Sequence, residues 1–226
     1  MKLNQRKHVT IIIIIIAACS FMAFVDAIWS PEYFIKSFLK LFLFFILPAS
    51  YAVISKHFSL KELLVVKNQS ILIPLILGAG VYLFILGAYY VLGPYFDFSN
   101  VTVALSENYG VKKDNFIAVA LYISFINSFL EEIFFRGFAF LILKKFTSRR
   151  VAYLFSAASF SLYHVAIMSD WFHIMLFLLL ILSLFVAGLL FNWFDEKRNT
   201  VYTSWLVHMA ANLATNTIGF MLFGIL

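Results

Sequence analysis

Long apolar runs separated by short polar connections dominate this chain. Seven runs approach or exceed the roughly 20 residues that a helix needs to cross a bilayer; they are residues 9–29, 34–54, 71–92, 116–143, 151–169, 173–194 and 201–225. Backbone polar groups inside a bilayer must be satisfied internally, so each run is predicted to be a helix. The pattern predicts an all-α polytopic membrane protein with about seven transmembrane helices, eight being the alternative count.

The connections between the runs reveal no second domain. The longest polar stretch, residues 93–115, is predicted to hold a short interfacial helix. The first run follows a basic start, as in a signal peptide, but its apolar part exceeds the usual 7–15 residues and indicates a retained span. Residues 1–226 are therefore interpreted as a single membrane domain.

Composition agrees with this interpretation and narrows the function. Apolar residues make up 63% of the 226 residues and charged residues 12%, whereas soluble domains average about 45–50% and 25%. The single cysteine, Cys19, excludes a disulfide framework and a cysteine zinc cluster. A net charge of +6 is compatible with nucleic-acid binding, but its distribution along the chain favours a different explanation.

The basic residues alternate between connections, as expected for a multi-pass protein. Twelve of the 17 Lys and Arg residues lie before the first run or in the second, fourth and sixth connections. The positive-inside rule then predicts a cytoplasmic N-terminus, membrane lipid as a partner and no nucleic acid. Lys36 and Lys40, in the second run, fit least well. They are predicted to reach the outer interface by snorkelling, unless that span begins later, and Asp26 is predicted to be solvated.

Six of the polar side chains inside the later runs are candidates for a site, because charged groups are costly there and need a reason. They are Glu131, Glu132, Arg136, His164, His208 and Asn212. At 1.5 Å per residue, the glutamate at 131, the two histidines and the asparagine lie about 10 to 20 Å from the cytoplasmic ends of their helices. Because three separate helices place these groups at compatible depths, the sequence predicts that they form one site.

The two adjacent glutamates are expected to differ in their surroundings. Glu132 and Arg136 are four positions apart and can form an ion pair on one helix face. Adjacent residues lie about 100° apart around a helix, so Arg136 cannot face Glu131 equally well. Glu131 then needs another partner or a function. A single histidine in a span is often a packing residue, but two beside a carboxylate indicate a functional site.

A carboxylate and two imidazoles in a dry pocket can activate a water molecule. Glu131 and His164 would hold that water, while His208 and Asn212, which share a helix face, would donate hydrogen bonds to a developing oxyanion. This arrangement suits amide hydrolysis. Glu131, His164 and His208 could equally bind zinc with a position open for water, and the residue pattern leaves both mechanisms open.

Three short motifs carry a resemblance to a known family. They are EEIFFR at 131–136, FSLYH at 160–164 and HMAAN at 208–212. In this order on successive late helices, they resemble the E-E-x-x-x-R, F-x-x-x-H and H-x-x-x-N motifs of the CPBP family of intramembrane proteases. That family includes the type II CAAX prenyl endopeptidases and the Abi-type bacterial proteins. The resemblance covers about residues 116–216, taken as the catalytic core.

The resemblance implies an all-helical endopeptidase that cleaves a membrane-associated peptide or protein arriving from the membrane or the cytosol. It assigns water activation to Glu131 and His164, and oxyanion stabilisation to His208 and Asn212. The supporting residues that it implies are Glu132, Arg136 and Phe160. It favours a glutamate-dependent mechanism without a cofactor, with zinc as the alternative. The family context favours a bacterial cell membrane, and peptide processing or bacteriocin immunity over cleavage of prenylated CAAX proteins.

Two other classes of function compete with the protease interpretation. One is a non-enzymatic membrane regulator or bacteriocin-immunity scaffold, for which Glu131 would be dispensable. The other is a transporter or proton relay, which also uses buried carboxylates and histidines. The chain shows neither inverted repeats nor paired helices broken by glycine or proline, which argues against a transporter.

Overall fold

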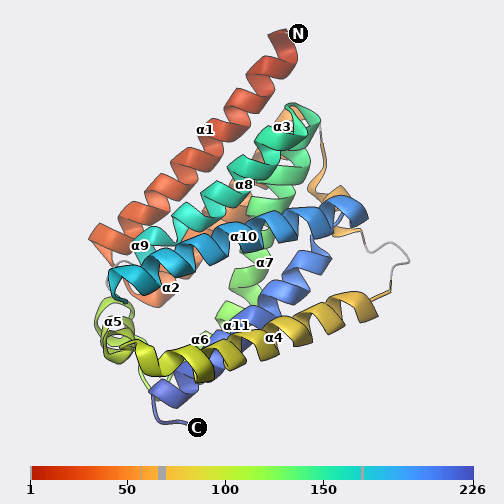
Figure 1. Cartoon of the computed structure of the whole chain (residues 1–226). Helices are drawn as coiled ribbons and strands as arrows, with labels where there is room; N and C mark the ends of the chain where they lie inside the picture. Colours follow the sequence, from red (N-terminus) through yellow and green to blue (C-terminus); the bar gives the residue numbers. More distant parts are fainter. Residues whose placement is uncertain (1, 57, 66–69, 169–170) are drawn as a thin grey trace.

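The computed structural model describes residues 2–56, 58–65, 70–168 and 171–226, and within these ranges it contains helices and no strands (Figure 1). Six helical segments are long and apolar enough to cross a membrane: Arg6–Trp29, Tyr33–Ser55, Leu72–Tyr95, Phe116–Lys145, Arg149–Met168 and Ile174–Arg198. Each coincides with a predicted run to within a few residues. The chain is therefore an all-α polytopic membrane protein.

The first three spans combine α-helices with short π-helical or 3-10 segments. Their elements are α1 (Lys2–Phe24), η1 (Val25–Trp29), α2 (Tyr33–Leu41), η2 (Phe42–Ile46), α3 (Leu47–Ser55), η3 (Leu60–Leu64), α4 (Leu72–Leu92) and η4 (Gly93–Tyr95). The next helix, α5 (Ser99–Tyr109), lies within the connection 93–115. It confirms the short helix that was predicted there.

The fourth span is built from several consecutive segments, and the remaining helices follow it. They are α6 (Phe116–Leu121), η5 (Tyr122–Asn127), α7 (Ser128–Glu131), η6 (Glu132–Ile142), η7 (Leu143–Lys145), α8 (Arg149–Tyr163), α9 (Val165–Met168), α10 (Ile174–Arg198) and α11 (Tyr202–Leu222). The segments η5 and η6 are π-helical. The π form is rare and occurs frequently at functional sites.

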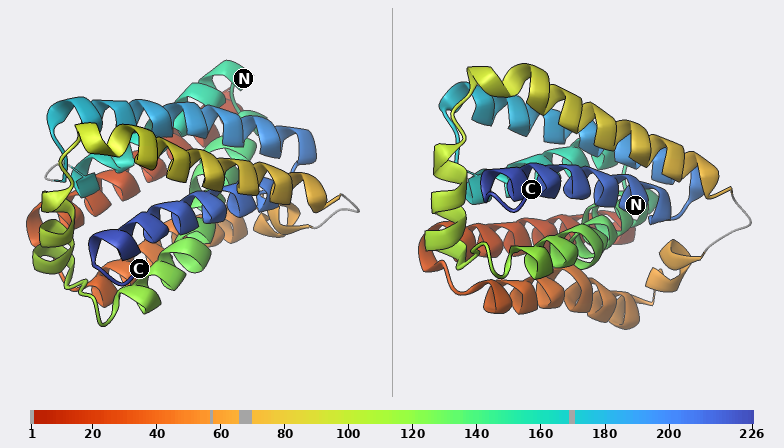
Figure 2. Two further views of the ribbon diagram at one scale, coloured as in Figure 1. Left: turned by 60° about the horizontal axis from the view of Figure 1, so that its bottom comes forward. Right: turned by 90° about the horizontal axis from the view of Figure 1, so that it is seen from below.

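The seventh predicted run, 201–225, forms α11 but is not among the six segments that are apolar enough to cross a membrane. Polar side chains, including His208, Asn212 and Asn216, interrupt its apolar sequence. The helix packs along α4, and the two views of Figure 2 show them side by side. A Cβ atom added to Gly78 of α4 would lie 3.1 Å from the Cβ of Ala210, so small residues permit this close approach.

The fourth span lies at the centre of the helix bundle. Half of its most apolar stretch is buried, compared with 11–33% in the other five spans. Every residue of η6 is buried, and its Phe134 ring stacks on Phe44 of η2 at a ring separation of 4.2 Å. Glu131 and its neighbours are therefore carried into the protein interior, away from the lipid-facing surface.

The predictions for the charged groups near the outer end of the first two spans are wrong. Asp26 is buried rather than solvated, and Lys36 is buried as well instead of extending outward. The Lys36 Nζ atom lies 3.3 Å from Asp26 Oδ1 and 3.6 Å from the ring centre of Tyr109, at the end of α5. The two groups neutralise each other inside the bundle, where local sequence rules predicted solvated charges.

Candidate active site

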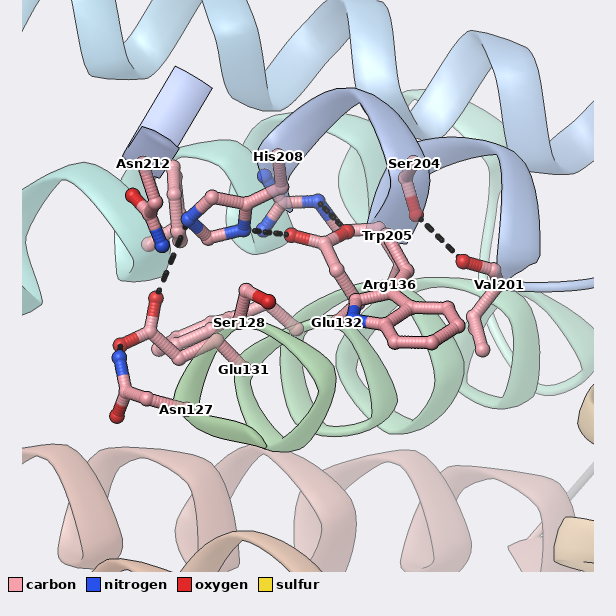
Figure 3. A network of polar contacts seen from close by, with 12 residues as sticks. Asn127, Ser128, Glu131, Glu132, Arg136, Val201, Ser204, Trp205, His208 and Asn212 are labelled. Carbon is pink, nitrogen blue, oxygen red and sulfur yellow. Dashed lines mark hydrogen bonds and ion pairs between the residues drawn. The ribbon is translucent and has the colours of Figure 1, made fainter. Parts of the chain in front are cut away.

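Three of the predicted site residues come together although they are far apart in the sequence, and Figure 3 shows two of them, Glu131 and His208, facing each other. Glu131 ends α7, His164 follows α8, and His208 lies in the second turn of α11. The Glu131 Oε2 atom is 3.9 Å from His164 Nε2 and 3.8 Å from His208 Nε2. The Glu131 carboxylate is almost completely buried, whereas the His164 side chain is 16% exposed. The prediction from helix depth that these residues share one location is confirmed.

Hydrogen bonds on the far side of each imidazole orient its Nε2 atom. His164 Nδ1 lies 2.8 Å from the carbonyl oxygen of Phe160. A carbonyl can only accept, so Nδ1 carries a hydrogen, and in the neutral form of the ring Nε2 is then unprotonated and faces Glu131. His208 Nδ1 lies 2.7 Å from Glu132 Oε1. Both rings are therefore held with Nε2 directed at the same carboxylate oxygen.

The other oxygen of Glu131 is occupied by two hydrogen-bond donors that sequence reasoning did not assign to the site. Lys40 Nζ donates to Glu131 Oε1 at 3.1 Å and to Asn127 Oδ1 at 2.6 Å. Asn127 Nδ2 donates to the same Glu131 oxygen at 3.0 Å. The prediction that Lys40 reaches the outer interface is wrong, because its ammonium group ends at the buried carboxylate.

Glu132 and Arg136 form the predicted ion pair inside the bundle. Arg136 Nε lies 3.2 Å from Glu132 Oε2, and neither side chain is exposed. The guanidinium carbon is 4.0 Å from the ring centre of Phe160 and 5.0 Å from that of Phe191. Within the described residues, no well-aligned hydrogen bond reaches the three Arg136 nitrogens. The arginine is therefore held by charge and by the two aromatic faces.

Phe160 is surrounded by the other polar members of the site. Its ring centre lies 4.8 Å from that of His164 and 5.7 Å from that of His208, in addition to the contact with Arg136. The phenyl ring thus contacts the Arg136 guanidinium and both imidazole rings. This position agrees with the shaping role that the family resemblance implies.

Asn212 lies one turn after His208 and is linked to the central span. Its Nδ2 atom donates to the carbonyl oxygen of Ile123 at 3.1 Å. Two further α11 side chains make the same kind of contact: Trp205 Nε1 with the Phe125 carbonyl and Asn216 Nδ2 with the Ala120 carbonyl. Figure 3 shows the Asn212 amide beside the gap between His208 and Glu131. One hydrogen of that amide is not needed for the bond to Ile123.

Comparison with known families agrees with this geometry. The model of the type II CAAX prenyl endopeptidase Rce1-like family matches residues 113–214. This part of the chain belongs to the CPBP/CAAX protease family. The matched range, called here the Rce1-like domain, contains all seven site residues that the motifs predicted. A search of curated proteins and a search of solved structures each found no match.

The match supports an intramembrane endopeptidase of the CAAX type in general. Within the Rce1-like domain, a buried residue outside the motifs helps to fix the position of α11. Asp195 of α10 accepts hydrogen bonds from the backbone nitrogen and the Oγ atom of Ser204, at 3.2 and 2.5 Å. This contact anchors the first turn of α11 and hence the position of His208. A lone aspartate at the end of an apolar run gave no signal of this role.

Zinc is the alternative to a metal-free mechanism, and the donor atoms of the Rce1-like domain provide a test of it. Glu131 Oε2 and the two Nε2 atoms are the only ligand set that the sequence suggested. Among the residues that the structure describes, no group of three His, Cys, Asp or Glu side chains has the arrangement of a metal site. The mechanism proposed for this site is therefore written for side chains and water alone, and zinc held by Glu131, His164 and His208 stays the alternative.

Proposed function

We propose that this membrane protease hydrolyses a peptide bond in a membrane-associated peptide or protein with a water molecule activated by Glu131 and His164. One observation carries the proposal. The Glu131 Oε2 atom faces two imidazole nitrogens at 3.8 and 3.9 Å, while the hydrogen bonds to this carboxylate are made to Oε1. These separations exceed a direct hydrogen bond, and we propose that a water molecule bridges Glu131 Oε2 and His164 Nε2.

A water molecule satisfies that arrangement. It can donate one hydrogen to Glu131 Oε2 and the other to His164 Nε2, because both atoms accept when the imidazole is neutral. The water oxygen adds to the carbonyl carbon of the substrate as its proton moves to Glu131, and the carbonyl oxygen becomes an oxyanion. Glu131 then delivers the proton to the amide nitrogen, the C–N bond breaks, and a carboxylic acid and an amine are released.

His208 and Asn212 are proposed to stabilise the oxyanion. In this role His208 holds a hydrogen on both ring nitrogens, and the Glu132 carboxylate, 2.7 Å from Nδ1, compensates the resulting charge. The amide hydrogen of Asn212 that does not bond Ile123 is the second donor. Hydrogen bonds aimed at developing charge in a dry site are among the largest contributions to catalysis. Arg136 and Phe160 keep Glu132 and the two rings in place.

The substrate is proposed to be a peptide that enters from the membrane or the cytosol. A cytoplasmic N-terminus would place the basic groups on the cytosolic side, including Lys144 and Lys145 at the end of the central span and Arg149 beyond it. The role proposed for a bacterial cell is maturation of a secreted peptide or immunity to a bacteriocin.

The first test compares membrane and secreted peptides from cells that make the native protein with cells that make the Glu131→Gln variant. We expect at least one peptide to change length only with the native protein, because glutamine cannot accept the proton of the attacking water. Peptide mass spectrometry would identify the substrate and the cleavage position together. Immunoblotting must show equal accumulation of both proteins. Identical peptides from both strains would instead favour a non-enzymatic regulator or immunity scaffold.

Chelation separates the two mechanisms that use Glu131. Treating the purified protein with a strong zinc chelator is expected to leave the rate of peptide cleavage within about twofold, since the proposed water is held by side chains alone. The rate before and after dialysis, and after adding zinc, provides the measurement. Complete loss that zinc restores would overturn the metal-free proposal and favour zinc held by Glu131, His164 and His208.

A further inference from the structure

The Rce1-like domain does not supply every group that contacts Glu131. Lys40 belongs to α2, 91 positions away from Glu131 and outside residues 113–214. Its side chain is only 12% exposed, and its Nζ atom reaches both Glu131 Oε1 and Asn127 Oδ1. The second span of the chain therefore enters the site directly.

Lys40, Asn127 and Glu131 form a closed triangle of hydrogen bonds. The ammonium group donates to the asparagine and to the glutamate, and the asparagine amide donates to the same glutamate oxygen. Glu131 Oε1 consequently has two donors, whereas Oε2 faces the imidazoles. We infer that Lys40 is a positioning residue that, with Asn127, holds Oε1 and so directs Oε2 at the attacking water. The catalytic part of this inference rests on the proposed function.

Charge pairing gives Lys40 a second reason to be in this place. Glu131 and Glu132 are adjacent in a buried helix, where an uncompensated charge is strongly destabilising. Arg136 lies beside Glu132, and Lys40 lies beside Glu131. Each carboxylate thus has its own cation. This arrangement supplies the partner that Glu131 lacks within its own helix.

Aromatic rings limit where the Lys40 ammonium can move. Its Nζ atom lies 5.1 Å from the ring centre of Tyr163 and 5.9 Å from that of Phe44. Two rings and two hydrogen-bond acceptors therefore restrict the flexible lysine side chain to one place. A side chain fixed in this way can hold a neighbouring catalytic group in its working orientation. Lys36, one turn earlier in α2, has a similar buried setting but pairs with Asp26. It provides a matched control.

The contact is tested by thermal unfolding of the purified full-length protein as wild type, Lys40→Met, Glu131→Gln and the double variant. Each single change leaves one buried charge without its partner, and we expect the Tm to fall by on the order of 10 °C. The double variant removes both charges and should be closer to wild type than either single variant. Additive losses in Tm would overturn the Lys40–Glu131 contact.

Positioning is tested by the kinetics of cleavage of the peptide found in the cell comparison, expressed per folded protein. Lys40→Met should lower kcat by about 10- to 100-fold, as the loss of outer-shell partners does at other sites, with little change in KM. Lys40→Arg, which keeps the charge, should recover part of the loss. The control Lys36→Met should lower the Tm but leave kcat within about twofold.

Different results would contradict the positioning role of Lys40 and the proposed protease function. Unchanged kcat in Lys40→Met, with coupled Tm values, would make Lys40 a structural partner only and would overturn the positioning role. Loss of kcat in Lys36→Met to the same extent would do the same. If the wild type cleaves no peptide that the Glu131→Gln variant leaves intact, the proposed function itself fails. The Tm values would still report on the contact between Lys40 and Glu131.

Discussion

Glu131→Gln, His164→Ala and the variant carrying both changes are expected to lower kcat for peptide cleavage by about the same factor, on the order of 10²–10⁴. The reason is that both side chains are proposed to act on one water molecule. Once either is lost the water is no longer activated, and losing the second costs little more. Groups that act as a unit show this strong non-additivity.

The measurement needs the peptide substrate in synthetic form and a protein concentration corrected for the folded fraction. This correction matters because Glu131→Gln also leaves the buried Lys40 ammonium without its partner. His173→Ala is the matched control, since His173 is an exposed histidine that precedes α10 and takes no part in the site. Losses that multiply in the double variant would show that Glu131 and His164 act in separate steps.

The sequence predicted the parts of the structure that depend on local pattern. Apolar runs located the spans to within a few residues, and a spacing of four predicted the Glu132–Arg136 pair. Counting residues from the helix ends placed Glu131 near both histidines, because a membrane gives independent helices a common depth scale. This common depth scale is the reason that the sequence alone could predict that Glu131, His164 and His208 lie close together.

The parts that were missed depend on tertiary contacts between distant segments. Lys40 and Lys36 lie in the second apolar run, where a general rule predicts snorkelling, yet both turn inward to carboxylates on other helices. Neither partner is a sequence neighbour, and no spacing links them. Glu131 did carry a signal, because a buried carboxylate with no cation on its own helix face requires one from elsewhere. A search of the other spans for that cation would have found Lys36 and Lys40 as candidates, and only the tertiary structure decides between them.

Arg136→Met is expected to destabilise the protein by about 3–5 kcal/mol, because it leaves the buried Glu132 carboxylate without its cation. The arginine is fully buried between the rings of Phe160 and Phe191, so water cannot replace it. Methionine retains much of the apolar volume, so the loss reports mainly on charge. Unfolding in detergent by heat or denaturant provides the measurement.

A comparable change in an exposed ion pair tests whether burial makes the Glu132–Arg136 pair important for stability. Arg149 forms an ion pair with Glu196 at 2.7 Å, but its side chain is 62% exposed, so Arg149→Met should change the Tm only slightly. Adding Glu132→Gln to Arg136→Met removes the uncompensated carboxylate and should recover part of the lost stability. Equal effects of Arg136→Met and Arg149→Met would mean that solvent reaches Arg136, and that the site is not the dry pocket on which oxyanion stabilisation by His208 depends.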